Sequence, residues 1–217
     1  MIEPNMATML CFILTDAKVD KFALQKALAD AVQESFNRIS VDGDMSTNDT
    51  VLCFANGAAG NRTLKPGHRD WNTFNDALLA LCQRMAWKII RDGEGATKVV
   101  KIEVTGARSD KEADATARSV ANSLLVKTSW YNDYPNFGRI MDALGYSKAK
   151  VVEEKVDIDY DGLLIVKGGL RTAIDVERVK KVQRKETFTI RINLNLGKGA
   201  SHVFGCDCAQ AYIDINI

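Results

Sequence analysis

The sequence lacks any marked excess of charge and any long apolar run, and each absence excludes a class of protein. Its 29 Lys and Arg residues are balanced by 28 Asp and Glu residues, so the net charge is +1. Neither a long basic run nor basic residues interleaved with aromatics occur, and nothing predicts binding to nucleic acid. No apolar run approaches the roughly 18 residues needed to span a bilayer. We therefore expect neither a nucleic-acid partner nor a membrane.

Signals for secretion and for metal binding are also weak. Met1–Pro4 bring no basic region of a signal peptide. The five cysteines are odd in number and lie in apolar segments, which favours reduced core thiols over a disulfide framework. His202, Cys206 and Cys208 lack a fourth zinc ligand, so we expect no metal. These features predict a reducing, cytoplasmic compartment.

Hydrophobic periodicity predicts helices alternating with strands, without internal repeats. The expected helices lie within residues 16–34, 70–90, 109–124, 136–144 and 175–185. The expected strands are residues 10–14, 50–54, 99–105, 151–166, 187–196 and 211–216. This mixture predicts an α/β or α+β fold. A shift in composition near residues 147–150 suggests a main α/β layer at 1–148 and a smaller, strand-rich lobe at 149–217.

Two motifs resemble ligand-binding loops only in part. Asp157, Asp159 and Asp161 follow the spacing of an EF-hand, but Gly168 stands where that loop needs a bidentate Glu. Alternation with apolar residues favours a half-solvated strand that ends in a turn. Gly197–Ser201 lacks the full spacing and the following helix of a phosphate-binding loop.

Residues 42–49 are dense in turn-forming and hydrogen-bonding side chains. Such a segment builds either a capped turn or the polar wall of a site, and the sequence leaves both open.

Ala7 and Thr8 precede the apolar segment Met9–Leu14. Taken alone, an Ala-Thr pair at this position is most simply the start of a strand. A threonine at a free N-terminus would be a nucleophile, because its own α-amine can act as the base.

Several longer segments give Thr8 a context. They are Phe36–Thr50, Ala55–Gly60, Arg91–Lys98, Asn122–Ser123, Val126–Thr128 and Pro135–Ile140. In this order they resemble the ornithine acetyltransferase family, the ArgJ proteins of the cyclic arginine pathway, and the resemblance runs almost end to end. It implies an αββα sandwich of the ArgJ/DmpA-like type with a smaller C-terminal α/β lobe.

The resemblance also implies the site. It makes Ala7-Thr8 a self-cleavage site and Thr8 the catalytic nucleophile. Glu94 stands in Asp-Gly-Glu-Gly-Ala-Thr, the motif whose Glu binds substrate in this family, although alone it would be a solvated turn residue. Asn216 matches the asparagine of the family's C-terminal Ile-Asn motif, which lines the substrate pocket.

The activity that the resemblance implies is glutamate N-acetyltransferase, which moves acetyl from N-acetylornithine to glutamate. No cofactor is expected, and acetyl-CoA would be a co-substrate only in bifunctional members. The chain corresponds to the β subunit with the cleavage-site segment, and an α2β2 heterotetramer is implied. The family's oxyanion-hole Thr-Gly pair and a substrate-binding lysine precede the position of Met1, and a hydroxyl-bearing pocket residue follows Ile217. We therefore expect the isolated chain to hold an incomplete site.

Two alternatives remain. A self-processing amidohydrolase or aminopeptidase would share the Thr8 chemistry but pass the acyl group to water, so product analysis with and without glutamate would separate it. The other alternative is a non-catalytic subunit or stranded gene fragment that only binds a partner, and whether a neighbouring reading frame encodes the α half would separate it.

Overall fold

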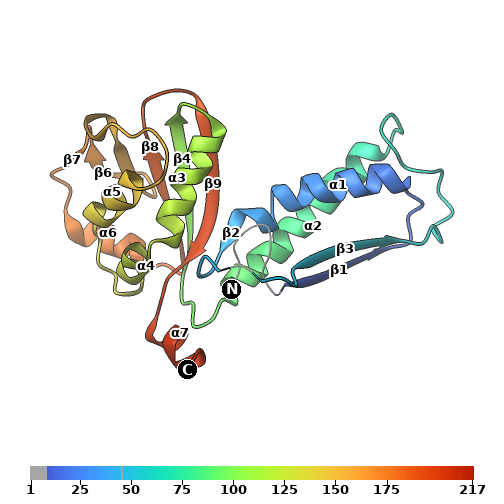
Figure 1. Cartoon of the computed structure of the whole chain (residues 1–217), viewed down its shortest axis with the longest axis horizontal. Helices are drawn as coiled ribbons and strands as arrows, with labels where there is room; N and C mark the ends of the chain where they lie inside the picture. Colours follow the sequence, from blue (N-terminus) through green and yellow to red (C-terminus); the bar gives the residue numbers. More distant parts are fainter. Residues whose placement is uncertain (1–8, 45) are drawn as a thin grey trace. The chain divides into compact units, whose positions relative to one another are not determined.

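The computed structural model describes residues 9–44 and 46–217, and its contacts divide the chain into two compact units. One unit extends to Ile89 and the other comprises Ile90–Ile217 (Figure 1). The division falls in the last turns of helix α2 (Trp71–Arg91), rather than between the expected parts 1–148 and 149–217. The strands on either side of position 148 belong to one sheet, as described below, so the change in composition there does not coincide with a change of core.

The first unit packs helices against a parallel pair of strands. Its elements are β1 (Leu10–Thr15), α1 (Lys21–Gln33), the 3₁₀ turn η1 (Phe36–Arg38), β2 (Ile39–Ser40), β3 (Thr50–Ala55) and most of α2. β1 and β3 run parallel, with Phe12 opposite Leu52 and Leu14 opposite Phe54. Helix α1 begins at Asp20, whose carboxylate accepts hydrogen bonds from the backbone N–H groups of Phe22 and Ala23.

The two faces of this strand pair differ because successive side chains of a strand point to opposite sides. Cys11 and Ile13 are buried. The alternate residues form what we call the β1–β3 apolar face, which is exposed to solvent. It consists of Leu10, Phe12, Leu14, Leu52 and Phe54.

The second unit contains a mixed sheet and most of the core. Its elements are β4 (Val99–Ala107), α3 (Asp110–Asn122), α4 (Leu124–Tyr131), α5 (Phe137–Gly145), η2 (Glu153–Lys155), β5 (Asp157–Tyr160), β6 (Leu163–Lys167), β7 (Leu170–Arg171), α6 (Val176–Gln183), β8 (Thr187–Asn193), β9 (Gly199–Cys206) and α7 (Gln210–Ile215). Within this unit the strands lie in the order β9-β4-β8-β5-β6-β7. β4 is parallel to β8 and antiparallel to β9.

One face of this sheet is apolar and buried under helices. Val100, Ile102 and Val104 of β4 are fully buried in a core shared with α3 and Trp130 of α4. Helix α3 lies across β4 and β9 (Figure 1). Ser109 caps α3, because its hydroxyl accepts a hydrogen bond from the N–H of Glu112 at 3.3 Å.

The opposite face carries charge. Glu103 of β4 pairs with Lys101 at 2.5 Å and with Arg191 of β8 at 3.0 Å, and Arg191 also reaches Asp159 of β5 at 3.3 Å. The aspartates with EF-hand spacing therefore form ion pairs with basic side chains: Asp157 pairs with Lys167 and Asp161 with Lys185. The prediction of a strand that ends in a turn is confirmed.

The mixed α/β class is confirmed, but several elements differ from expectation. The strand expected at residues 151–166 is divided into η2, β5 and part of β6, and helix α4 was not expected. The strand expected at residues 211–216 is wrong, because Gln210–Ile215 forms helix α7. Strand β9 was not among the expected strands. Gly199 is needed inside the strand because a Cβ there would lie 2.2 Å from the carbonyl carbon of Ser109.

Candidate functional site

The segment that follows the expected nucleophile is tied to the loop before β3. Ala7 and Thr8 lie outside the described residues, and Met9 is the next residue of the chain. The N–H of Met9 donates to the carboxylate of Asp49, and its carbonyl accepts from the N–H of Thr50 at 2.8 Å. The N–H and the carbonyl of Met9 are thus both hydrogen-bonded, so the backbone is held in place where it enters β1.

The polar segment at residues 42–49 consists largely of capped turns. Asp42 accepts from the N–H of Asp44 at 2.9 Å, and the hydroxyl of Ser46 accepts from the N–H of Asn48 at 3.2 Å. Asp49 is the member that reaches another strand. Burial raises the pKa of the Asp49 carboxyl, and the hydrogen bond from Met9 opposes that rise. Both alternatives left open by the sequence therefore have support, with Asp49 as the residue beside the nucleophile segment.

Glu94 lies on a tight turn that follows α2. The N–H of Ala96 donates to the carbonyl of Gly93 at 2.9 Å, and Gly95 has a φ of +66°. Glu94 is half-buried, and one of its carboxylate oxygens is inaccessible to solvent. The carboxylate of Glu94 is therefore partly shielded from water, unlike that of a fully solvated turn residue.

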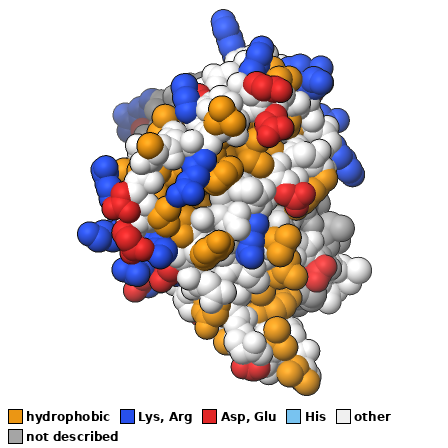
Figure 2. Space-filling view, turned by 90° about the vertical axis from the view of Figure 1, so that its left-hand side faces the viewer, with side chains coloured by type: hydrophobic (Ala, Val, Ile, Leu, Met, Phe, Trp, Pro, Cys, Tyr) orange, Lys and Arg blue, Asp and Glu red, His pale blue; other side chains and the backbone are white. Residues whose placement is uncertain are grey.

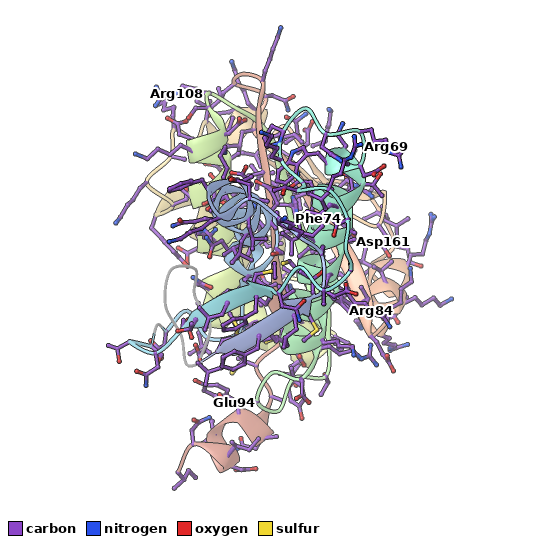
Figure 3. The ribbon with its side chains drawn as sticks, turned by 90° about the vertical axis from the view of Figure 1, so that its right-hand side faces the viewer. Arg69, Phe74, Arg84, Glu94, Arg108 and Asp161 are labelled. Atoms are coloured by element: carbon purple, nitrogen blue, oxygen red, sulfur yellow. The ribbon has the colours of Figure 1, made fainter. Side chains whose placement is uncertain are left out.

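The C-terminal helix packs on this turn. A Cβ at Gly95 would lie 2.7 Å from the backbone nitrogen of Tyr212 and 2.8 Å from the Cβ of Ala211. Figure 3 shows Glu94 on the loop beside this helix. Asn216 ends α7, where its side-chain amide donates to the carbonyl of Tyr212 at 2.8 Å and is exposed. The structure thus brings the Glu94 turn and the helix carrying Asn216 together.

Asp207 joins the segment after the Glu94 turn to the segment before α7 by hydrogen bonds, and the sequence does not predict this role. It is 2% exposed, and its carboxylate accepts from the N–H groups of Thr97 and Lys98, each at 2.8 Å. The Thr97 hydroxyl donates to the other oxygen at 2.5 Å. We call this set of hydrogen bonds the Asp207 clamp. It joins the strand that follows the Glu94 turn to the segment that leads into α7.

Two lysines brace the clamp. The ammonium of Lys98 donates to the carbonyl of Trp130 at 2.6 Å and pairs with Asp133. Lys127 is buried on α4, and its ammonium donates to the carbonyl of Cys206, the residue before Asp207. The only sequence signal for the clamp is a single acidic residue between Cys206 and Cys208.

Thiols and metal ligands do not assemble into a site in the described part of the chain. All five cysteines are free. Burial raises the pKa of Cys82 to about 11, and nearby Cys11 and Cys53 add to the rise, so this thiol stays protonated at neutral pH. Residues 9–44 and 46–217 contain no cluster of three or more His, Cys, Asp or Glu that could hold a metal ion.

None of the helices in the described residues is long and apolar enough to cross a membrane.

A profile of the ArgJ family matches residues 1–217. The chain therefore belongs to the ArgJ family.

Relatives of known name agree with this assignment. The chain is 44% identical over 216 residues to the arginine biosynthesis bifunctional protein ArgJ of Geobacillus kaustophilus, and 46% identical over 217 residues to that of Geobacter sulfurreducens. It spans about half the length of these curated relatives, 53% and 55%.

The fold matches as well. The crystal structure of ArgJ from Bacillus halodurans superposes with a TM-score of 0.91 at 43% identity. The match covers 96% of this chain and 99% of that one.

Proposed function

We propose that this chain is the nucleophile-bearing β part of a glutamate N-acetyltransferase of arginine biosynthesis. Membership of the ArgJ family along the whole chain carries this proposal. The extent of the matches supports a separate β part: the chain spans 53% of a curated relative but 99% of a solved ArgJ chain. A solved chain of this extent is what cleavage of a longer precursor would leave.

Maturation would begin at Ala7-Thr8. The hydroxyl of Thr8 attacks the carbonyl carbon of Ala7, the peptide C–N bond breaks, and the resulting ester is hydrolysed to release the carboxylate of Ala7. The freed α-amine of Thr8 is then the base that its own hydroxyl needs. The hydrogen bonds of Met9 with Asp49 and Thr50 support this step, because they hold the chain on the C-terminal side of the scissile bond.

Acetyl transfer would use the same hydroxyl. Thr8 Oγ attacks the acetyl carbonyl of N-acetylornithine while its α-amine takes the hydroxyl proton and passes it to the departing α-nitrogen of ornithine. The acetyl-Thr8 ester is then attacked by the amine of glutamate, which yields N-acetylglutamate and restores the hydroxyl. The cycle is ping-pong and uses no metal or organic cofactor, with acetyl-CoA as a further donor only if the enzyme is bifunctional.

Glu94 suits the binding of ornithine, since a carboxylate pairs with the side-chain ammonium that N-acetylornithine carries. Its turn is held by Gly95 against α7 and by the Asp207 clamp, so its position does not depend on solvent-exposed contacts alone. Asn216 lies on that same helix and would line the pocket.

The exposure of the β1–β3 apolar face supports the proposal that a partner covers it. Parallel strands occur almost only where both faces of the sheet are covered, and a two-stranded sheet is marginal by itself. Here Leu14 is 78% exposed, Phe12 57% and Phe54 52%. The remaining half of the relatives' length, the α part, would cover this face and supply the oxyanion donors and the substrate lysine, in an α2β2 assembly in the cytoplasm.

Intact-mass measurement of the chain coexpressed with an α half tests the proposal. We expect the β chain to lose the mass of Met1–Ala7 and to carry deuterated acetyl after incubation with labelled N-acetylornithine. Thr8→Ala should abolish both changes, and Thr8→Ser should retain some of each. Full processing and turnover in Thr8→Ala would contradict the assignment, whereas acetate release without acetylglutamate would identify a hydrolase instead.

A further inference from the structure

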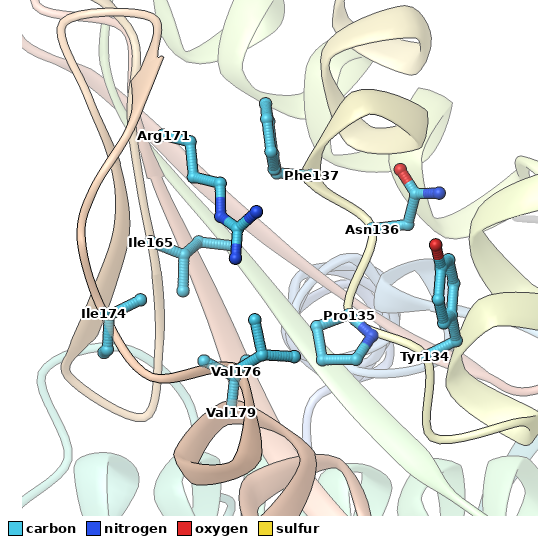
Figure 4. Close-up of a pocket in the computed structure, with 9 residues that line it drawn as sticks. All are labelled: Tyr134, Pro135, Asn136, Phe137, Ile165, Arg171, Ile174, Val176 and Val179. Atoms are coloured by element: carbon cyan, nitrogen blue, oxygen red, sulfur yellow. The ribbon is translucent and has the colours of Figure 1, made fainter.

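A cavity of about 230 Å³ lies in the second unit, away from the residues assigned to acetyl transfer. It is bounded by the segment that leads into α5, by strands β6 and β7, and by the start of α6 (Figure 4). Its apolar lining includes Phe137, Ile165, Ile174 and Val179. Ile165 and Val179 are members of the buried core, so the floor of the cavity is as firm as the core itself.

Arg171 brings a positive charge to this apolar surface. Figure 4 shows its guanidinium extending into the space between Phe137 and the start of α6. Two basic side chains of the same unit have acidic partners: Lys180 pairs with Glu177 and Lys185 with Asp161, each at 2.7 Å. Within the described part of the chain the guanidinium of Arg171 has no hydrogen bond or ion pair. The cavity therefore contains a cation without an internal counter-ion.

The backbone around Arg171 is fixed. Arg171 pairs with Val166 in the sheet, and the next residue, Thr172, donates its N–H to the carbonyl of Ile165 at 3.0 Å. The hydroxyl of Thr172 also donates to the carbonyl of Leu164 at 2.8 Å. The side chain thus starts from a paired strand and not from a free loop, which reduces the entropy lost when its guanidinium binds a ligand.

The lining has two further polar side chains, Tyr134, whose hydroxyl can donate a hydrogen bond, and Asn136. The side-chain oxygen of Asn136 accepts from the N–H of Arg139 at 3.2 Å, as the cap of α5, so its amino group is the end left for other contacts. No residue that lines the cavity carries a carboxylate. Hydrogen-bond donors and a positive charge above an apolar floor select for a ligand that has a negative end and an apolar body.

We propose that this cavity binds a small monocarboxylate with an apolar body, whose carboxylate pairs with Arg171. The guanidinium fork matches the two oxygens of a carboxylate. The volume lies below the range of about 300–1,000 Å³ typical of drug-sized ligands, so the ligand is of amino-acid size. The site is independent of the proposed acetyl transfer, since it shares no residue with it.

The first test compares three probes with one body on the full chain by isothermal titration calorimetry. They are 3-phenylpropionate, 3-phenylpropanol and 3-phenylpropylamine. We expect saturable binding of the carboxylate, with the alcohol weaker by about tenfold to a hundredfold, the range for a charge-assisted hydrogen bond, and the amine not bound. Equal affinities for carboxylate and alcohol, or no binding of the carboxylate at millimolar concentration, would overturn the proposal.

The second test locates the binding. Arg171→Gln should bring the affinity for 3-phenylpropionate down to that for the alcohol, while Arg171→Lys should keep part of the difference. The matched control is Arg178→Gln, an exposed basic residue of α6 outside the lining, which should change affinity less than twofold. An equal loss in Arg178→Gln would mean diffuse attraction to a basic surface, and undiminished binding by Arg171→Gln would place the ligand elsewhere. Figure 2 shows this side of the unit, where basic side chains border exposed apolar ones.

Discussion

The two units bury their sheets in different ways. In the second unit β4 and β8 pack their apolar residues under helices, and Val100, Ile102 and Ile190 are completely buried. In the first unit β1 and β3 bury only the side toward their own helices and expose Phe12 and Leu14. The second unit therefore has a large buried core, and the first has one sheet face that its described residues leave open. This difference separates residues that stabilise the fold from residues available for assembly.

The largest effect is expected in the core of the second unit. Phe188 is 2% exposed and stacks on Tyr160 with ring centroids 5.8 Å apart. Phe188→Ala should lower the free energy of unfolding by about 3–5 kcal/mol, because it removes apolar burial and leaves a cavity. Denaturant unfolding followed by tryptophan fluorescence measures this. A loss below 1 kcal/mol would mean that the core of this unit is not the stable part of the chain.

The next effect concerns the β1–β3 apolar face. Phe12→Asp should change the stability of the isolated chain by less than about 0.5 kcal/mol, as for other exposed positions. It should weaken binding to the α half by about 2–4 kcal/mol, the range for buried aromatic anchors of interfaces. Titration of the α half measures the affinity. Leu170→Asp, at a leucine that is 76% exposed on β7, is the control and should leave it unchanged. Equal loss in both variants would refute a specific face.

Glu94→Gln should have a smaller effect that is confined to catalysis. It removes the negative charge but keeps the volume, so kcat/KM for N-acetylornithine should fall by about tenfold to a hundredfold, equivalent to 1.5–3 kcal/mol. Cleavage at Ala7-Thr8 and the glutamate half-reaction should persist. An unchanged kcat/KM would return Glu94 to the role of a turn residue, and a loss of cleavage would show that it acts in maturation.

The smallest effect is a difference in the pH dependence of stability. Burial opposes ionisation of Asp157, but hydrogen bonds from Lys167, Gly168 and Asn195 outweigh it and lower the pKa. This carboxyl stabilises the fold above its unfolded pKa, and the gain is lost as pH falls through its folded value. For Asp49, burial raises the pKa, so folding favours the protonated form and the sign is reversed.

Unfolding of Asp157→Asn and Asp49→Asn between about pH 3 and pH 7 compares the two carboxyls. Asp157→Asn should cost more stability at neutral than at acid pH, and Asp49→Asn should show no such excess at neutral pH. Parallel profiles for the two variants would contradict the assignment of opposite shifts.

Sequence periodicity predicted those helices and strands whose conformation depends least on contacts with distant parts of the chain. Helices α2 and α3 lie where hydrophobic periodicity predicts helices, within one or two residues at each end. Ile213 and Ile215 alternate with polar residues and so suggested a strand, yet the chain there is a short helix packed on Gly95. No local pattern reveals that contact, because it joins segments more than a hundred residues apart in sequence.

The candidate site shows the same limit. Glu94 could be proposed only through the family motif, and Asp207 could not be proposed at all. The meaning of Asp207 depends on two N–H groups of Thr97 and Lys98, which no side-chain pattern encodes. Likewise the order of strands, with β4 between β9 and β8, places residues from distant segments side by side. Pairing of this kind is decided by the packing of the whole sheet.

The Asp207 clamp also bears on how the protein is made. Thr97 and Asp207 are 110 positions apart, so the hydrogen bonds between them close one of the longest loops in the chain. During synthesis the Glu94 turn emerges more than a hundred residues before Asp207, and it gains this anchor only once residue 207 has left the ribosome. A chain that stops short of this point can build β4 and α3 and still lack a fixed Glu94 turn. The Glu94 turn can therefore become fixed only after translation has passed residue 207.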